Sequence, residues 1–165
     1  MRERVVDVTL RFAHDVSLGA WFGGAWMGAV GLNSATMEVD DHTQRTRVAN
    51  AGWFRWAPVV GLSVVVHTAC AAALGRLSVP TGRRWSLLQV VRTAMTGLAV
   101  LATIETGVSG RRVVQAGDVP VATAVVPISS PPPEVAAAQR RLRIAQWLVP
   151  AFTACLWVID AVQEG

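Results

Sequence analysis

The sequence predicts an all-α protein, an antiparallel bundle of four transmembrane helices with a long proline-rich loop between the third and fourth. Hydrophobic residues make up 52% of the chain and are gathered into four blocks, each near the roughly 20 helical residues that cross a bilayer core. Only 16% of the residues are charged, and the mean hydropathy is +0.40, unlike an ordinary soluble domain. We therefore expect residues 1–165 to form a single integral membrane domain.

The charged residues support the same class. All fifteen basic residues are arginines, and most of them flank the apolar blocks, as cationic residues flank membrane spans. Membrane flanking explains this basic balance more simply than nucleic-acid binding, so we expect no nucleic-acid partner. The two cysteines, Cys70 and Cys155, fall inside apolar blocks and do not predict a disulfide between loops.

The first block predicts a span over residues 8–32. Basic residues precede it, as in a signal peptide, but Arg11, His14 and Asp15 interrupt its start, so we expect a retained span. Small residues four positions apart let membrane helices approach closely. That spacing predicts a packing face on Gly19, Gly23, Gly24 and Gly28.

The next two blocks predict a pair of spans over residues 53–75 and 85–108. The polar stretch 33–52 precedes them, and Pro80 and Gly82 predict a tight turn within residues 76–84. The third span carries polar residues at helical spacing, among them Gln89, Arg92 and Thr96. Because polar side chains facing lipid are costly, we expect this stripe to face the bundle interior.

The longest connection covers residues 109–143. Its segment 113–133 is rich in proline and valine, which predicts either an extended segment lying over the bundle or a mobile linker, with a polyproline-like end. Residues 134–143 begin with an acid and end with arginines, as helices do. We expect this helix to continue into the fourth span, residues 144–162.

Ionisable residues of the four spans are predicted to share one depth. The spans alternate in direction, and a rise of 1.5 Å per residue places His14, His67, Arg92 and Asp160 roughly 4–12 Å from the N-terminal side of the membrane. Charged groups at that depth should face inward and pair. The pairing is predicted to form an intramembrane polar cluster: Arg11, Asp15, Arg92 and Asp160.

Two alternatives place a cofactor in this layer. His14 and His67 could ligate a b-type haem from opposite faces, with Arg92 near a propionate. Copper could instead be bound by four imidazole and thiol ligands: His14, His67, Cys70 and Cys155. A different alternative is a proton-linked or solute path through the layer. Glu105, paired to Arg55, would be the ionisable residue at the opposite end of this path.

Two stretches resemble known membrane proteins. Residues 14–24, HDVSLGAWFGG, resemble the first span of bacterial CopD-type copper-resistance membrane proteins, which implies an integral membrane protein with copper or haem association. Residues 119–150, VPVATAVVPISSPPPEVAAAQRRLRIAQWLVP, resemble uncharacterised small four-span proteins of actinobacterial type. This second resemblance implies no activity.

No nucleophile with a base, glycine-rich phosphate loop or zinc signature is present in the sequence, so we expect no enzyme. The sequence favours a small multi-pass protein of the cell membrane with an accessory, structural or assembly role. Its expected partners are the lipid bilayer and either a second copy or a larger membrane complex. The wholly basic connection at residues 76–84 favours a cytoplasmic N-terminus.

Overall fold

A computed structural model describes residues 1–75, 86–117, 120–128 and 131–164. The tight turn expected at residues 76–84 lies outside these residues. The described chain is mostly helical and contains four long helices, α1 (Arg2–Met27), α3 (His42–Ala73), α4 (Leu87–Gln115) and α5 (Pro133–Glu164). The expectation of an all-α protein with four long helices is therefore confirmed at this level.

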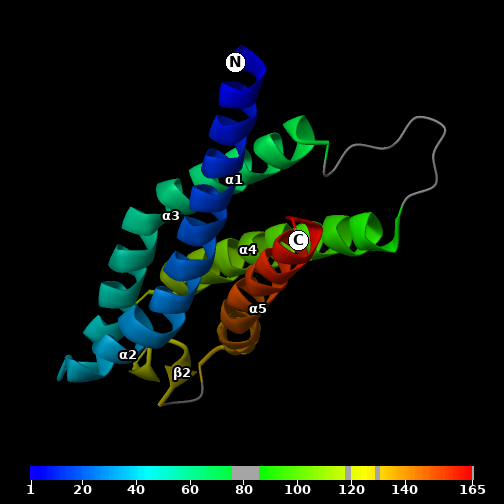
Figure 1. Cartoon of the computed structure of the whole chain (residues 1–165). Coiled ribbons are helices and arrows are strands. Elements are labelled where there is room, and N and C mark those ends of the chain that lie inside the picture. The colour runs from blue at the N-terminus through cyan, green and yellow to red at the C-terminus, as the bar shows by residue number, and fades with distance from the viewer. Residues whose placement is uncertain (76–85, 118–119, 129–130, 165) are drawn as a thin grey trace.

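The long helices pack as two pairs joined through α1 and α5. The helix α1 lies against α3, and α4 lies along α5, while α3 and α4 make few direct contacts. Figure 1 shows the N-terminus at one end of the molecule and the segment after α1 at the other, together with the connection between α4 and α5. The core between the helices is small and apolar, and it contains Leu18, Trp21, Ala99 and Leu156.

The helical backbone of α1 continues beyond Met27. A π-helical turn, η1 (Gly28–Leu32), is followed by the short helix α2 (Asn33–Ala35) and the 3₁₀ turn η2 (Thr36–Glu38). Two of the five residues of η1 are glycines, which are weak helix formers. The polar stretch 33–52 is therefore largely helical, since α3 already begins at His42.

Caps fix the starts of α3 and α4. The Asp41 side chain accepts a hydrogen bond from the backbone N–H of Thr43, as expected of a helix N-cap. Ser86 and Gln89 form a capping box at the start of α4. Gln89 therefore serves the helix end, not the interior stripe to which the sequence analysis assigned it.

The connection between α4 and α5 is shorter than residues 109–143, because α4 continues to Gln115 and α5 begins at Pro133. Within it, β1 (Val121–Thr123) pairs antiparallel with β2 (Val126–Pro127). Val121, Ala124 and Val125 of this hairpin are buried. The hairpin thus packs against α3 and α5, where Ala124 and Val125 form a small apolar cluster with Ala49 and Leu142.

Arg45 at the start of α3 fastens the hairpin. Its guanidinium donates to the carbonyl oxygen of Ala122 at 2.7 Å, and also to the carbonyls of Met37 and Val39. One side chain therefore joins α3, the hairpin and the segment after α1.

In the part of the chain that the structure describes, three helical segments are long and apolar enough to cross a membrane: His42–Ala73, Leu87–Gln115 and Pro133–Val162. The helix α1 is not among them. Its first half carries Arg11, His14 and Asp15, and the uncharged stretch continues past its end into η1. By length and composition, the described residues thus contain three candidate crossings, whereas the sequence predicted four.

Candidate functional site: a buried polar cluster

Each long helix contributes one ionisable side chain to a single buried cluster. His14 lies on α1, His67 on α3, Arg92 on α4 and Asp160 on α5, and none is more than 5% exposed. From here on, these four residues are called the polar cluster. This set contains the two histidines in place of Arg11 and Asp15 of the cluster predicted from the sequence. The four residues are distant in sequence and meet because the long helices that carry them pack against one another.

Two contacts carry most of the charge in the polar cluster. Arg92 forms an ion pair with the carboxylate of Asp160. The Nε2 atom of His14 lies 3.9 Å from Oδ2 of the same carboxylate. Buried charges are stable only when paired, so Asp160 is the residue on which the cluster depends.

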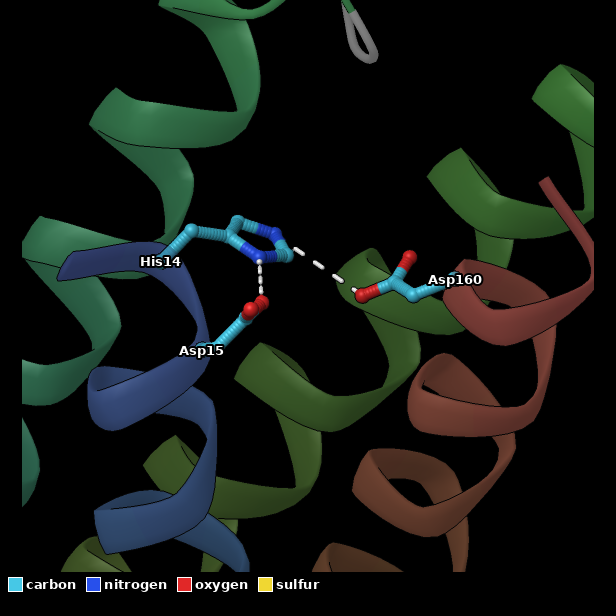
Figure 2. Close-up of side chains that lie close together, drawn as sticks. All are labelled: His14, Asp15 and Asp160. Carbon is cyan, nitrogen blue, oxygen red and sulfur yellow. Dashed lines mark hydrogen bonds and ion pairs between the residues drawn. The ribbon is translucent and has the colours of Figure 1, made fainter. Parts of the chain in front are cut away.

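Figure 2 shows the imidazole of His14 between the carboxylates of Asp15 and Asp160. The two carboxylates differ in exposure. The Nδ1 atom of His14 is 2.9 Å from Oδ1 of Asp15, whose side chain is 54% exposed, whereas the side chain of Asp160 is 6% exposed. The ring therefore connects a carboxylate at the surface to one in the interior.

His67 contributes through ring contacts. The centroids of the His14 and His67 rings are 4.3 Å apart with an interplanar angle of 31°. On the other side, His67 meets the indole of Trp21 edge-on, with centroids 5.9 Å apart. His67 thus lies at the boundary between the polar cluster and the apolar core.

The direct contact between the His14 and His67 rings does not fit the proposed haem site. Axial ligation by two histidines requires the iron and the porphyrin plane between the imidazoles. Rings with centroids 4.3 Å apart are in direct contact and leave no space for the macrocycle. The convergence of His14, His67 and Arg92 expected from the sequence is present, but as a stacked and ion-paired cluster.

The residues proposed for copper are not gathered. Cys155 is exposed, whereas Cys70 is buried. Among the described residues, the group of potential ligands close enough to share an ion is His14, Asp15 and Asp160. However, the two carboxylates face opposite nitrogens of one imidazole, so a single ion cannot engage both along the ring's lone pairs, and Arg92 already neutralises Asp160.

Two further predicted residues have other partners than those expected. Arg11 is exposed, and its Nε donates to Asp7 at 2.9 Å one turn earlier. Glu105 accepts a hydrogen bond from Ser109 at 2.8 Å, and no ion pair with Arg55 is present in the described chain.

The predicted glycine face divides into two parts. A β-carbon at Gly24 or Gly28 would lie 2.1 Å from an indole ring of α3, that of Trp56 or Trp53 respectively. Gly19 has only ordinary contact with Trp157, and Gly23 has nothing within 4 Å. Close approach therefore occurs at two of the four positions, between α1 and α3.

A second polar network went unnoticed in the sequence. Asn33 accepts a hydrogen bond from Trp53 Nε1 at 3.1 Å and donates to Oε1 of Gln146 at 2.7 Å. Trp21 Nε1 donates to Thr103 Oγ1 at 3.0 Å. The one available signal was Gln146, an isolated amide inside an apolar block, which needs a partner when buried.

Searches against protein-family models, curated proteins and solved structures found no match to this chain. The resemblances to CopD-type proteins and to small actinobacterial membrane proteins therefore rest on the quoted residues alone. The fold and the site define a mostly helical protein with a buried ionisable cluster, whose described residues include three helices long and apolar enough to cross a membrane.

Proposed function

We propose that this chain is a multi-pass protein of the cell membrane whose four long helices form an antiparallel bundle. Support comes from the outer surface, where large apolar side chains are exposed, including Leu62 (65%), Leu101 (63%) and Val158 (65%). Water would not favour so many exposed apolar side chains, whereas lipid does. Small residues inside and large ones outside are also typical of helix association in membranes.

The fourth crossing in this proposal is α1 with its continuation η1. The two segments form 31 helical residues, 26 in α1 and 5 in η1, more than the roughly 20 needed to cross. The polar residue in the middle of α1, His14, faces the interior and is fully buried. Arg11 lies nearer the N-terminus, where its long side chain can reach the interface, and the Asp15 carboxylate lies 2.9 Å from Nδ1 of His14.

Topology can be measured in a variant in which both natural cysteines are replaced by serine. Single cysteines are introduced by Val5→Cys and Ala116→Cys, and intact cells are treated with a membrane-impermeant maleimide. We expect Ala116→Cys to react from outside and Val5→Cys to react only after permeabilisation, because the N-terminus is cytoplasmic in this proposal. Reaction of both from the same side would show that α1 is not a crossing.

Within this bundle, the polar cluster is proposed to lock the four helices in one register, giving the protein an accessory or structural role in a membrane assembly. The observation that carries this proposal is that each long helix gives one buried polar group to the same cluster. In a low-dielectric interior, any sliding of one helix would leave a charge unpaired.

The lock is tested by removing its charges singly and together. Arg92→Met leaves Asp160 buried without its partner and should lower the free energy of unfolding by about 3–5 kcal/mol. The double variant Arg92→Met with Asp160→Leu should recover most of that loss, because no charge is left buried. Thermal unfolding in detergent measures both, with Arg112→Met at an exposed site as control. A single variant as stable as the wild type would refute the lock.

A second candidate function, proton-linked transport, is favoured by the position of His14 between exposed Asp15 and buried Asp160 (Figure 2). Such an arrangement allows a proton to reach the interior through one imidazole. In proteoliposomes, Asp15→Asn or Arg92→Leu should abolish a proton flux that Asp7→Asn leaves intact. A flux unchanged in both cluster variants would count against this function.

A further inference from the structure

A cavity of about 290 Å³ lies between α3 and α4, at the end of the molecule closed by the β1–β2 hairpin. None of the four residues of the polar cluster lines this cavity, and Trp21, which does, separates the cavity from His67. Neither the lock nor the proton-linked proposal uses this space. Its size is at the lower end of the roughly 300–1,000 Å³ typical of small-molecule sites.

The walls of the cavity are mainly apolar. Trp21, Trp53 and Phe54 supply aromatic surface. Glycines on both sides keep the space open, since a β-carbon at Gly61, Gly107 or Gly110 would meet nothing within 4 Å. Water in such a space has few hydrogen-bond partners, so an apolar occupant is favoured.

Two polar groups mark one end of the cavity. Gln146 is only 8% exposed, and its Oε1 accepts from Asn33. Within the described part of the chain, its amide nitrogen donates no hydrogen bond, so this donor is available to an occupant of the cavity. Arg111 also lines the cavity and is exposed to solvent, and no carboxylate of the described residues forms an ion pair with it.

We propose that this cavity binds one acyl chain of an amphiphile with an acidic, oxygen-bearing head group. The chain lies among the aromatic residues and glycines, the head group pairs with Arg111, and a head-group oxygen accepts from Gln146. A methylene group is similar in size to a water molecule of roughly 30 Å³, so the cavity holds a chain segment of about ten methylene groups. The same chemistry is offered by a free fatty acid and by an anionic phospholipid.

This inference rests on the proposed membrane setting but not on the role of the polar cluster. The variants that test it leave His14, His67, Arg92 and Asp160 unchanged. A failure here would therefore leave the lock intact, and the loss of the lock would leave the cavity intact.

The test fills the cavity from its open side. The protein is purified in mild detergent, delipidated, and mixed with a sixteen-carbon fatty acid or with phosphatidylglycerol, and bound molecules are counted by native mass spectrometry. Gly107→Leu should lower occupancy at least about tenfold, because its side chain occupies the acyl volume. Gly97→Leu on the same helix also meets nothing within 4 Å but does not line the cavity, and it should bind as the wild type does.

Two further variants keep the test decisive. If Gly107→Leu fails to fold, as judged by circular dichroism, Gly61→Leu fills the cavity from α3. Arg111→Gln should weaken binding about threefold or more, the order expected for one exposed ion pair, while Arg112→Gln should not. Preference for the fatty acid or for phosphatidylglycerol identifies the head group, and either supports the site.

Three results would overturn the proposal. One is equal occupancy in the cavity-filled and Gly97→Leu proteins. Another is equal binding of phosphatidylcholine, whose head group is neutral overall, with no effect of Arg111→Gln. The third is no binding of either acidic amphiphile at a stoichiometry near one.

Discussion

The indole ring of Trp53 on α3 lies against the backbone of Gly28, so closely that a β-carbon at residue 28 would be 2.1 Å from the ring. The same ring donates its Nε1 hydrogen to Asn33. Trp53 therefore holds α3 against the π-helical turn and also joins the network that reaches α5. The absence of a side chain at Gly28 is what permits this contact.

Gly28→Ala should consequently destabilise the protein. The added methyl group forces the indole away and strains the packing, which typically costs about 1–3 kcal/mol. Gly23→Ala, where a β-carbon meets nothing within 4 Å, should have little effect. The measurement is the unfolding midpoint in detergent, and equal midpoints for the two variants would contradict the structure.

Replacing Gln139 should stabilise the protein, in contrast to the destabilisation expected for Gly28→Ala. Its side chain is 1% exposed, and neither amide atom has a hydrogen-bond partner among the described residues. Removing an unsatisfied buried amide should stabilise the protein by about 1–3 kcal/mol, so Gln139→Met is expected to raise the unfolding midpoint. Gln115→Met at an exposed site serves as control. A lower midpoint for Gln139→Met would mean that the amide has a partner in solution.

The Arg45 contacts make a local prediction about the hairpin. Arg45→Ala removes the bond to Ala122 and those to Met37 and Val39. A bond with a charged donor contributes roughly 1.5 kcal/mol or more, so amide exchange in residues 121–127 should accelerate at least about tenfold. Exchange in the centre of α4 should not change. Unaltered exchange in the hairpin would show that its buried side chains suffice to hold it.

Asp41 gives the start of α3 a pH dependence. The hydrogen bond from the Thr43 side chain, followed by that from the Thr43 backbone, lowers the pKa of Asp41 below its usual 3.8. The cap is therefore fully effective above that value and is lost as pH falls through the lower, folded-state pKa. Amide exchange at Thr43 and Gln44 should rise there in the wild type. In Asp41→Asn, which keeps a good cap, it should show no such step.

Much of the fold follows from the distribution of apolar residues. Four apolar blocks predicted four long helices, because helices of this composition need little beyond length to be recognised. Their ends were misplaced where the backbone stays helical past the apolar block, as at Gln115 and at His42. Hydropathy marks where lipid contact ends, whereas Asp41 and the Ser86–Gln89 box mark where the helices begin.

The sequence predicted the position of the site along the helices, but not which side chains contact one another there. Depth arithmetic brings His14, His67, Arg92 and Asp160 to one level, and there the structure places them together. It cannot tell which face of the helix a residue occupies, so Arg11 was assigned to the interior although it pairs with Asp7 outside. Nor does the depth of a residue give the distance between the two histidine rings. Their centroids lie 4.3 Å apart, too close for a haem to lie between them.

The polar cluster is also off-centre along the molecule. It lies toward the N-terminal side, with Asp15 as its solvent-facing neighbour, while Trp21 and the apolar core separate it from the hairpin end. In the proposed membrane setting, the polar cluster therefore lies nearer one face of the bilayer, and the direction in which the protein is inserted decides which compartment Asp15 faces.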